Sequence, residues 1–329
     1  MDLVEVCQIV RARHLAEQPS IIKKEDQVSD KHQEHIYCIS HDALGRILQH
    51  EDIARLSDGI FVFMNERHDP ETQEVIGHEV GSRECYELGR YIGRADWEQK
   101  HRKALETDPE KLQLITYGLL VDNLGRIAVY ERLKYDGGEV QLTGKLSLGY
   151  GGHLTGHDVR YVLKPERNGQ TGPSDIIDPA ATVVRCMINE FEGEVWMIAI
   201  PTQEHIMFGP EDLEALGYIY LPNEAKPKDA GNFHLGLLMR YTLYGDAEIM
   251  QPPNVVQPEA AFRFWVTPEE LAEIADDDSY EPWSREIARN YHKLPAYTMA
   301  EGPSAGEQEF EEPEPVSYTH LTLPTNREV

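Results

Sequence analysis

Cysteine is scarce in this sequence, and its spacing excludes two kinds of stabilising centre. Among 329 residues there are four cysteines, Cys7, Cys38, Cys85 and Cys186. They are far apart and form no C-x-x-C pair, so they predict neither a disulfide framework nor a zinc site. Reduced thiols are typical of intracellular proteins, and we therefore expect a cytoplasmic location.

Long hydrophobic runs are also missing. No segment approaches the ~20 consecutive apolar residues that a transmembrane helix needs. Residues 1–13 carry acids at Asp2 and Glu5 and lack the layout of a signal peptide. The sequence therefore predicts no membrane as a partner.

Basic residues are outnumbered by acidic ones. The chain has 31 Lys and Arg against 58 Asp and Glu, for a formal net charge of −27. Such a field repels polyanions, so we expect no nucleic acid and no anionic membrane among the partners. Residues 301–314 contain six glutamates and no lysine or arginine, and we interpret them as part of an acidic tail.

The middle of the chain is rich in strand signals. Residues 112–121 are apolar, residues 122–125 read as a turn, and residues 126–133 alternate apolar and charged side chains, which together predict a hairpin. Residues 95–105 have a helical pattern. Strands and helices alternate without regular βαβ repeats, so we predict an α+β fold, a mixed sheet with helices on both faces.

A clearer helix begins at Asp178-Pro179. Asp caps free backbone N–H groups well, and proline suits the first helical position. Its apolar face is predicted from the spacing of five residues: Val184, Met187, Ile188, Phe191 and Val195. The same pattern places Arg185, Cys186, Asn189, Glu190 and Glu192 off this face.

One glycine-rich segment stands out, residues 145–154, with the sequence KLSLGYGGHL. The Gly151-Gly152 turn, followed by a helix with Arg185 and Glu190, resembles the Nudix box, G-x5-E-x7-R-E-U-x-E-E-x-G-U, where U is aliphatic. The wider sequence is similar to the branch known as predicted Nudix phosphoesterases. The similar stretches are Leu114-Ile115-Thr116-Tyr117, residues 144–153, His234-Leu235-Gly236-Leu237 and Glu281-Pro282-Trp283-Ser284.

The resemblance covers residues 112–293 and implies both a fold and a chemistry. Nudix proteins have an α/β/α sandwich and use Mg²⁺ or Mn²⁺ to hydrolyse a diphosphate linked to another moiety, often a nucleoside. Residue by residue, Gly152 matches the first glycine of the box, Arg185 the arginine, and Glu190 the second glutamate of the E-E pair. In the family this arginine orients carboxylates, which implies a structural role for Arg185.

The box is degenerate, because three of its four carboxylates are missing. Asn189 stands at the first position of the E-E pair, and Cys186 follows the arginine where a glutamate is expected. The position of the first glutamate of the box is counted in two ways. Counted back from Arg185 it is occupied by Ile177, and counted forward from Gly152 it is occupied by Asp158. An amide oxygen carries no full charge and is a poorer ligand for a hard cation than a carboxylate.

From these considerations the candidate residues follow. We expect Glu190 and Glu259 to be catalytic. Four residues are candidate metal ligands: Gly152, Asn189, Glu190 and Glu194. Three are candidate substrate contacts: Lys145, Gly151 and Gly152. His153 and His234 are interpreted as hydrogen-bonded structural residues.

The predicted organisation has five parts. They are a segment at residues 1–35, an N-terminal α+β extension at 36–111, a Nudix-like domain at 112–295, an acidic tail at 296–316 and a non-native read-through at 317–329. The first functional hypothesis is a Nudix-like hydrolase that cleaves a diphosphate linkage in a nucleoside-diphosphate-type substrate with Mg²⁺ or Mn²⁺. The alternatives are a catalytically impaired nucleotide-binding or regulatory module on the same scaffold, and a protein that binds a partner through its acidic tail. The oligomeric state is left open.

Overall fold

The computed structural model describes residues 35–295, apart from 71, 93–95, 106–107, 135–141, 166–170, 201, 224, 226–229, 244, 251 and 254–257. The chain divides into two compact units, Met1–Tyr297 and Thr298–Val329. All described elements belong to the first unit. The predicted segment at 1–35, apart from its last residue His35, the acidic tail and the read-through lie outside the described residues.

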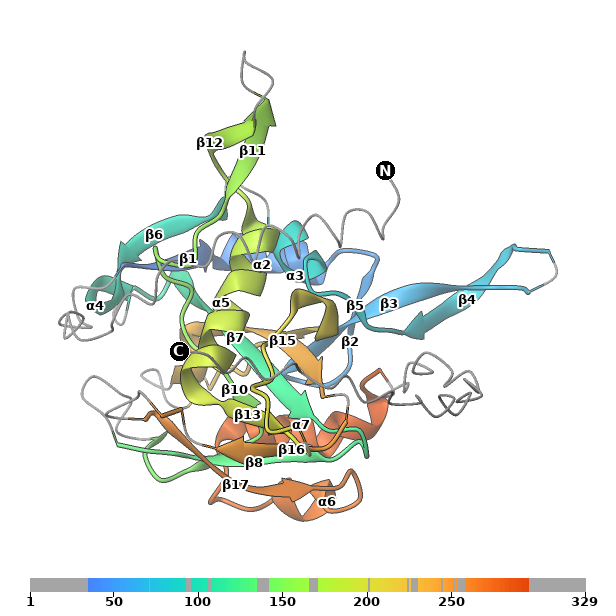
Figure 1. Cartoon of the computed structure of the whole chain (residues 1–329). Coiled ribbons are helices and arrows are strands. Elements are labelled where there is room, and N and C mark those ends of the chain that lie inside the picture. The colour runs from blue at the N-terminus through green and yellow to red at the C-terminus, as the bar shows by residue number, and fades with distance from the viewer. Residues whose placement is uncertain are drawn as a thin grey trace, which may run out of the picture. The chain divides into compact units, whose positions relative to one another are not determined.

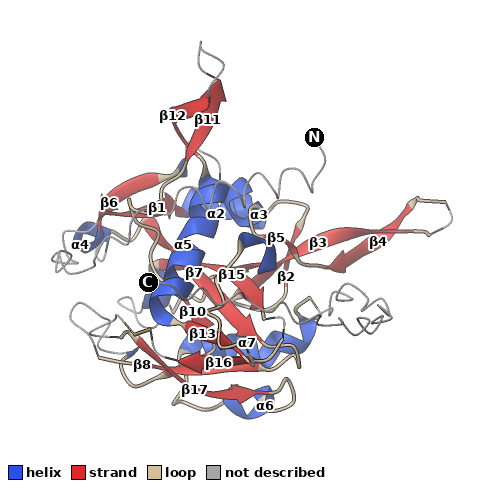
Figure 2. Cartoon of the chain, in the orientation of Figure 1, coloured by secondary structure: helices blue, strands red, loops and turns tan. Residues whose placement is uncertain are grey.

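The described chain is rich in strands (Figure 2). The strands are β1 (His35–Ser40), β2 (Ile53–Arg55), β3 (Ile60–His68), β4 (Val75–Val80), β5 (Arg83–Glu84), β6 (Glu98–His101), β7 (Lys111–Val121), β8 (Ile127–Arg132), β9 (Leu146–Ser147), β10 (Gly149–Tyr150), β11 (Tyr161–Pro165), β12 (Thr171–Ile177), β13 (Trp196–Ala199), β14 (Leu213–Ile219), β15 (His234–Thr242), β16 (Ala247–Met250) and β17 (Ala260–Val266). The helices are α2 (His41–Leu48), α3 (Glu87–Arg90), α4 (Arg102–Leu105), α5 (Pro179–Glu194), α6 (Leu271–Ile274) and α7 (Pro282–Asn290), with 3₁₀ turns η5 (Pro210–Asp212), η6 (Ala230–Asn232) and η7 (Tyr291–Lys293).

Thirteen of the described strands form one mixed sheet, whose main path runs β17-β8-β7-β15-β14-β3-β2. The central pair, β7 and β15, is parallel, with His234 opposite Gln113 and Thr242 opposite Val121. The other neighbours on this path are antiparallel. The mixed α+β fold expected from the sequence is confirmed.

Helices cover both faces of this sheet (Figure 1). On one face Gly118 of β7 lies against Met187 and Phe191 of α5, closely enough that a Cβ atom there would meet the Met187 sulfur at 2.6 Å. On the other face Tyr117 packs edge-on against Trp283 of α7, with ring centroids 5.3 Å apart. Every residue of β15 is buried, as expected of a strand covered on both sides.

Local patterns predicted most of these elements. The β7–β8 hairpin closes with Val121 opposite Ile127, and α5 begins where expected, since the Asp178 carboxylate accepts a hydrogen bond from the Ala181 amide at 3.2 Å. The helix predicted at 95–105 is wrong over its first part. Residues 98–101 form β6 instead, because they pair with β1, with Tyr37 opposite Gln99.

The N-terminal extension and the region after residue 111 share this sheet. β3 pairs with β14, and β1 pairs with β7. The predicted boundary at 111/112 lies within β7, which pairs with β1 of the extension, and the two parts bury a common core.

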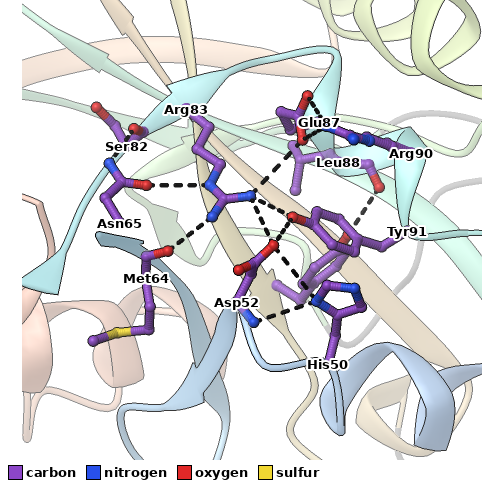
Figure 3. Close-up of polar contacts among 11 residues, drawn as sticks. His50, Asp52, Met64, Asn65, Ser82, Arg83, Glu87, Leu88, Arg90 and Tyr91 are labelled. Atoms are coloured by element: carbon purple, nitrogen blue, oxygen red, sulfur yellow. Dashed lines mark hydrogen bonds and ion pairs between the residues drawn. The ribbon is translucent and has the colours of Figure 1, made fainter. Parts of the chain in front are cut away.

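Arg83 contacts several segments of the N-terminal extension (Figure 3). Its guanidinium donates to the Met64 carbonyl at 2.8 Å and to Oδ1 of Asn65 at 3.2 Å, and it contacts Asp52 at 3.5 Å. The same group lies over the ring of Phe63, 5.1 Å from its centroid. These contacts join β2, β3 and β5 on the side of the sheet where β5 pairs with β14.

None of the helices in the described ranges is long and apolar enough to cross a membrane.

Candidate functional site

The glycine segment runs along the edge of β7. β10 pairs with β7, with Tyr150 opposite Gly118, and the chain continues beside β7 in the same register to His153, which lies opposite Ile115. The turn expected at Gly151-Gly152 is therefore wrong, because pairing with β7 keeps this segment extended. A Cβ atom on Gly151 would lie 1.8 Å from the carbonyl oxygen of Thr116, so only glycine fits. The Thr116 amide donates to the Gly152 carbonyl at 3.0 Å and joins the glycine pair to β7.

A buried polar network holds the strands β9 and β10, which precede Gly151. The Glu281 carboxylate, 3% exposed, accepts hydrogen bonds from Tyr117, Ser147 and Ser284, and from Nε of Arg132 at 3.0 Å. The Ser284 hydroxyl accepts a bond from the Leu148 amide at 2.9 Å. The stretch at 281–284 thereby fixes the glycine segment against the start of α7.

The Glu190 carboxylate lies against Gly152. A Cβ atom added to Gly152 would meet its Oε1 at 2.5 Å and its Oε2 at 2.8 Å. Glycine at 152 thus leaves room for this carboxylate beside the backbone. The structure brings together the two residues that the Nudix-box resemblance paired.

Cys186 faces inward, and its predicted position off the apolar side of α5 is wrong. It is fully buried, and its thiol lies 3.7 Å from the His153 carbonyl and 3.5 Å from the Thr116 hydroxyl. Burial raises the pKa of this thiol well above its ordinary value, and the charges of Asp158 and Glu190 raise it further. The side chain is therefore a neutral thiol that packs α5 against the glycine segment.

Asp158 completes the surroundings of this helix face. Its Oδ1 accepts a hydrogen bond from the Asn189 amide nitrogen at 2.7 Å, and its Oδ2 accepts bonds from the Thr155 amide and hydroxyl, both at 2.9 Å. The forward count from Gly152 is the sequence signal that points to Asp158. The amide oxygen of Asn189 is the atom left to contact a cation.

Glu194 lies one helical turn beyond Glu190 and lines a cavity of about 140 Å³. The other lining residues are Ile249, Met250, Ala260, Ala261 and Phe262. Glu259 directly precedes β17, the strand that contains Ala260, and its backbone carbonyl accepts a hydrogen bond from the Leu133 amide at 2.9 Å. The two carboxylates of α5 therefore lie in different surroundings, Glu190 beside Gly152 and Glu194 at the cavity.

The remaining candidates have other surroundings. The Lys145 ammonium donates to the Asp278 carbonyl, which ties it to the loop before α7. Nε of Arg185 is buried and has no hydrogen-bond partner among the described residues, so no carboxylate contact that would orient a ligand is seen there. His153 and His234 stack edge to face, with ring centroids 5.3 Å apart.

The donor set fits a divalent cation only in part. Within the described ranges, no three His, Cys, Asp or Glu side chains come together as a metal-binding group. Mg²⁺, however, is commonly held by one or two carboxylates together with water and substrate phosphates. Glu190, the Asn189 amide oxygen and the backbone of the glycine pair fit that open arrangement and not a closed set of protein ligands.

No family model matches the chain. Protein YmaB of Bacillus subtilis (strain 168) is 26% identical over 194 residues, which cover 58% of this chain and 76% of the relative.

Solved structures that resemble the chain include several Nudix proteins. Tm1382, named as a candidate Nudix hydrolase, has a TM-score of 0.45 at 16% identity and matches over 78% of this chain and 97% of its own. A Nudix hydrolase from Alicyclobacillus acidocaldarius has a TM-score of 0.32 at 11% identity, covering 54% of this chain and 90% of its own. A MutT/nudix family protein from Enterococcus faecalis has a TM-score of 0.31 at 12% identity, covering 56% and 62%. The chain is thus distantly similar to these Nudix proteins, each with a TM-score below 0.5.

Proposed function

We propose that this protein hydrolyses a diphosphate linkage in a small molecule with the help of Mg²⁺ or Mn²⁺. The observation that supports this most directly is the Glu190 carboxylate held against the Gly152 backbone, 2.5 Å from where a Cβ atom would be. The long stretch between these residues folds so that an anionic oxygen lies beside the backbone of the glycine segment.

The roles of the residues follow from their positions. Glu190 supplies the negative charge that holds the cation, and the Asn189 amide oxygen adds a neutral ligand. Asp158 orients Asn189 through their 2.7 Å hydrogen bond. Glu259 is our candidate base, from the start of the strand next to the cavity. When bound, the cation neutralises phosphate charge and lowers the pKa of a coordinated water.

The small number of protein ligands predicts that the cation and the diphosphate strengthen each other's binding. Because one carboxylate and one amide leave most of the coordination sphere to water and phosphate, the cation should bind weakly alone and tightly together with a diphosphate. Calorimetry with Mg²⁺ in the absence and presence of methylenediphosphonate measures this coupling.

The decisive variant is Glu190→Gln, assayed with a panel of nucleoside and alkyl diphosphates and Mn²⁺ or Mg²⁺. We expect a loss of turnover of about 100-fold or more, because the substitution removes the charge that holds the cation. Glu192→Gln is the matched control, since Glu192 lies on the same helix about 200° away from Glu190. Equal turnover in both variants, or no turnover in the natural chain, contradicts a hydrolase.

One observation favours a second candidate, a binding module that has lost catalysis. Cys186 is a neutral, buried thiol, and Asn189 is tied to Asp158, so neither contributes a charged ligand. In that case nucleotide-type diphosphates bind with the same affinity before and after a chelator is added. A strong dependence of affinity on the cation separates the hydrolase from this alternative.

A further inference from the structure

A small antiparallel sheet follows α5 in the chain and is separate from the main sheet. β13 pairs with β16, with Trp196 opposite Met250. On the other side of β13, residues 204–206 run antiparallel to it, because Ile198 forms a bridge with His205. β13 is therefore the middle one of three extended segments.

The two faces of this small sheet differ. Successive residues of a strand point to opposite faces. One face carries Met197, which is fully buried, and Ile249, which packs against the core. Trp196, Ile198 and Met250 alternate with these residues and lie on the other face. This second face, the outward face, therefore points away from the core.

The outward face carries a continuous apolar stripe. The register of the three segments places Met207 on one side of Trp196 and Met250 on the other. Ile200 extends the face beyond β13, since its amide donates to the Asp246 carbonyl at 2.9 Å. The exposed fractions are 51% for Met207, 46% for Met250 and 48% for Ile200. Contiguous exposed apolar surface marks an interaction site, whereas single exposed apolar residues need no explanation.

The formal charges of the segments that build this face are all negative. Residues 190–221 contain seven carboxylates and no Lys or Arg, and residues 241–262 contain three carboxylates and no Lys or Arg. Two of these carboxylates, Asp246 and Glu248, are exposed on β16 or directly before it and alternate with the inward residues of that strand. The apolar stripe is thus bordered by negative charge.

His205 adds no positive charge to this border. Its ring stacks on Trp196, with centroids 3.7 Å apart and an angle of 16° between the planes. Burial lowers the pKa of this imidazole below its ordinary value, so the ring is neutral at pH 7. The stacked pair therefore contributes flat apolar surface to the stripe.

The charge of the border distinguishes between possible occupants of the face. A second copy of the chain brings the same carboxylates, and an anionic membrane or a nucleic acid brings phosphates, so all three are repelled. A cationic protein segment with an apolar side matches both the stripe and its border, and methionine side chains adapt to the shape of such a partner. We infer that the outward face of β13 and β16 is a docking surface for a basic, amphipathic segment of another protein. This inference does not depend on the reaction proposed above.

Calorimetry of the full chain with two synthetic peptides tests the inference. The first peptide is an amphipathic helix of leucine and lysine, about 18 residues long. The second has the same composition in a scrambled order that forms no apolar side. We expect the amphipathic peptide to bind with a Kd of about 10 μM or lower and the scrambled one at least about 10-fold more weakly, because both meet the charge but only the first covers the stripe.

Variants of the face locate the binding. The double substitution Met207→Gln and Met250→Gln replaces thioethers with amides of similar length, and it should weaken the amphipathic peptide by about 10-fold or more. Leu124→Gln is the matched control, because Leu124 is 70% exposed in the turn between β7 and β8 and should leave the affinity unchanged. Glu248→Gln should weaken binding by about 3-fold at low salt and have no effect at high salt, where charges are screened. Thermal melting confirms that each variant is folded.

Three outcomes overturn the inference. The first is equal affinity for the two peptides, or no binding of either, and the second is an affinity that survives the double methionine substitution. The third is another occupant that depends on the same two methionines. Dimerisation in sedimentation experiments, lost in the double variant, assigns the face to a second copy, and binding to phosphatidylserine vesicles, lost in the same way, assigns it to a membrane.

Discussion

Gly151 and Gly152 are neighbours in the chain, but glycine is required at each for a different reason. At Gly151 a side chain would collide with backbone, the Thr116 carbonyl at 1.8 Å. At Gly152 it would collide with the end of a flexible side chain, the Glu190 carboxylate. The first glycine therefore serves the fold, and the second serves the site.

This difference predicts losses of stability of different size for alanine at the two positions. Gly151→Ala should reduce the free energy of unfolding by about 3 kcal/mol or more, because the backbone must shift to remove the overlap. Gly152→Ala should cost about 1 kcal/mol or less, because Glu190 is able to rotate away. Urea denaturation measures both.

Activity should show the reverse order among folded proteins. Gly152→Ala displaces the Glu190 carboxylate and should abolish cation-dependent binding of methylenediphosphonate in a protein that remains stable. A Gly152→Ala variant that binds the cation and the diphosphonate like the natural chain contradicts the role given to this contact.

At the scale of elements, α5 organises the site by presenting different sides to different neighbours. Cys186 and Glu190 face the glycine segment, Asn189 faces the loop with Asp158, and Glu194 lines the cavity. The position of the helix is set by its apolar side, where Met187 and Phe191 pack against β7. A change in the start of α5 therefore acts on every one of these contacts.

The N-cap of α5 offers a test. Asp178 accepts the Ala181 amide at 3.2 Å, so Asp178→Ala should lower the free energy of unfolding by about 1 kcal/mol. Asp178→Asn keeps an accepting oxygen and should cost much less. The two midpoints of urea denaturation are compared directly, and equal losses in both variants would show that the accepted hydrogen bond is not the source of the stabilisation.

Elements that lack such a strong local signal were harder to predict. The charged stretch at 95–105 has helical spacing, yet residues 98–101 pair with β1 as strand β6. The hydrogen bonds of a neighbouring strand outweighed a weak intrinsic preference, since propensities differ by less than about 1 kcal/mol per residue.

At the scale of the first unit, the extension and the region after residue 111 make one sheet. β3 contributes Phe63 to the same core as Tyr218 of β14, with ring centroids 5.9 Å apart, and β1 lies beside β7. The extension is therefore part of the fold that positions the site.

Truncation tests this unity. A fragment of residues 112–295 should lose cooperative thermal unfolding, because β7 and β14 lose strand partners and core. Removal of residues 298–329 should leave the melting temperature within about 2 °C of the full chain, because they form a separate unit. A fragment 112–295 that melts cooperatively at the temperature of the full chain would show that the extension is dispensable.

The sequence by itself determined the hairpin of β7 and β8, the start and apolar side of α5, and the pairing of Gly152 with Glu190. These follow from local spacing, from turn and cap chemistry, and from a resemblance carried by a short segment. The tertiary structure alone decided that Cys186 faces inward, that Asp158 binds Asn189, that Lys145 is tied to the loop before α7 and that Glu194 lines a cavity. Such outcomes depend on how residues far apart in the chain pack, and periodicity along one helix contains no information about which loop or strand will cover each of its sides.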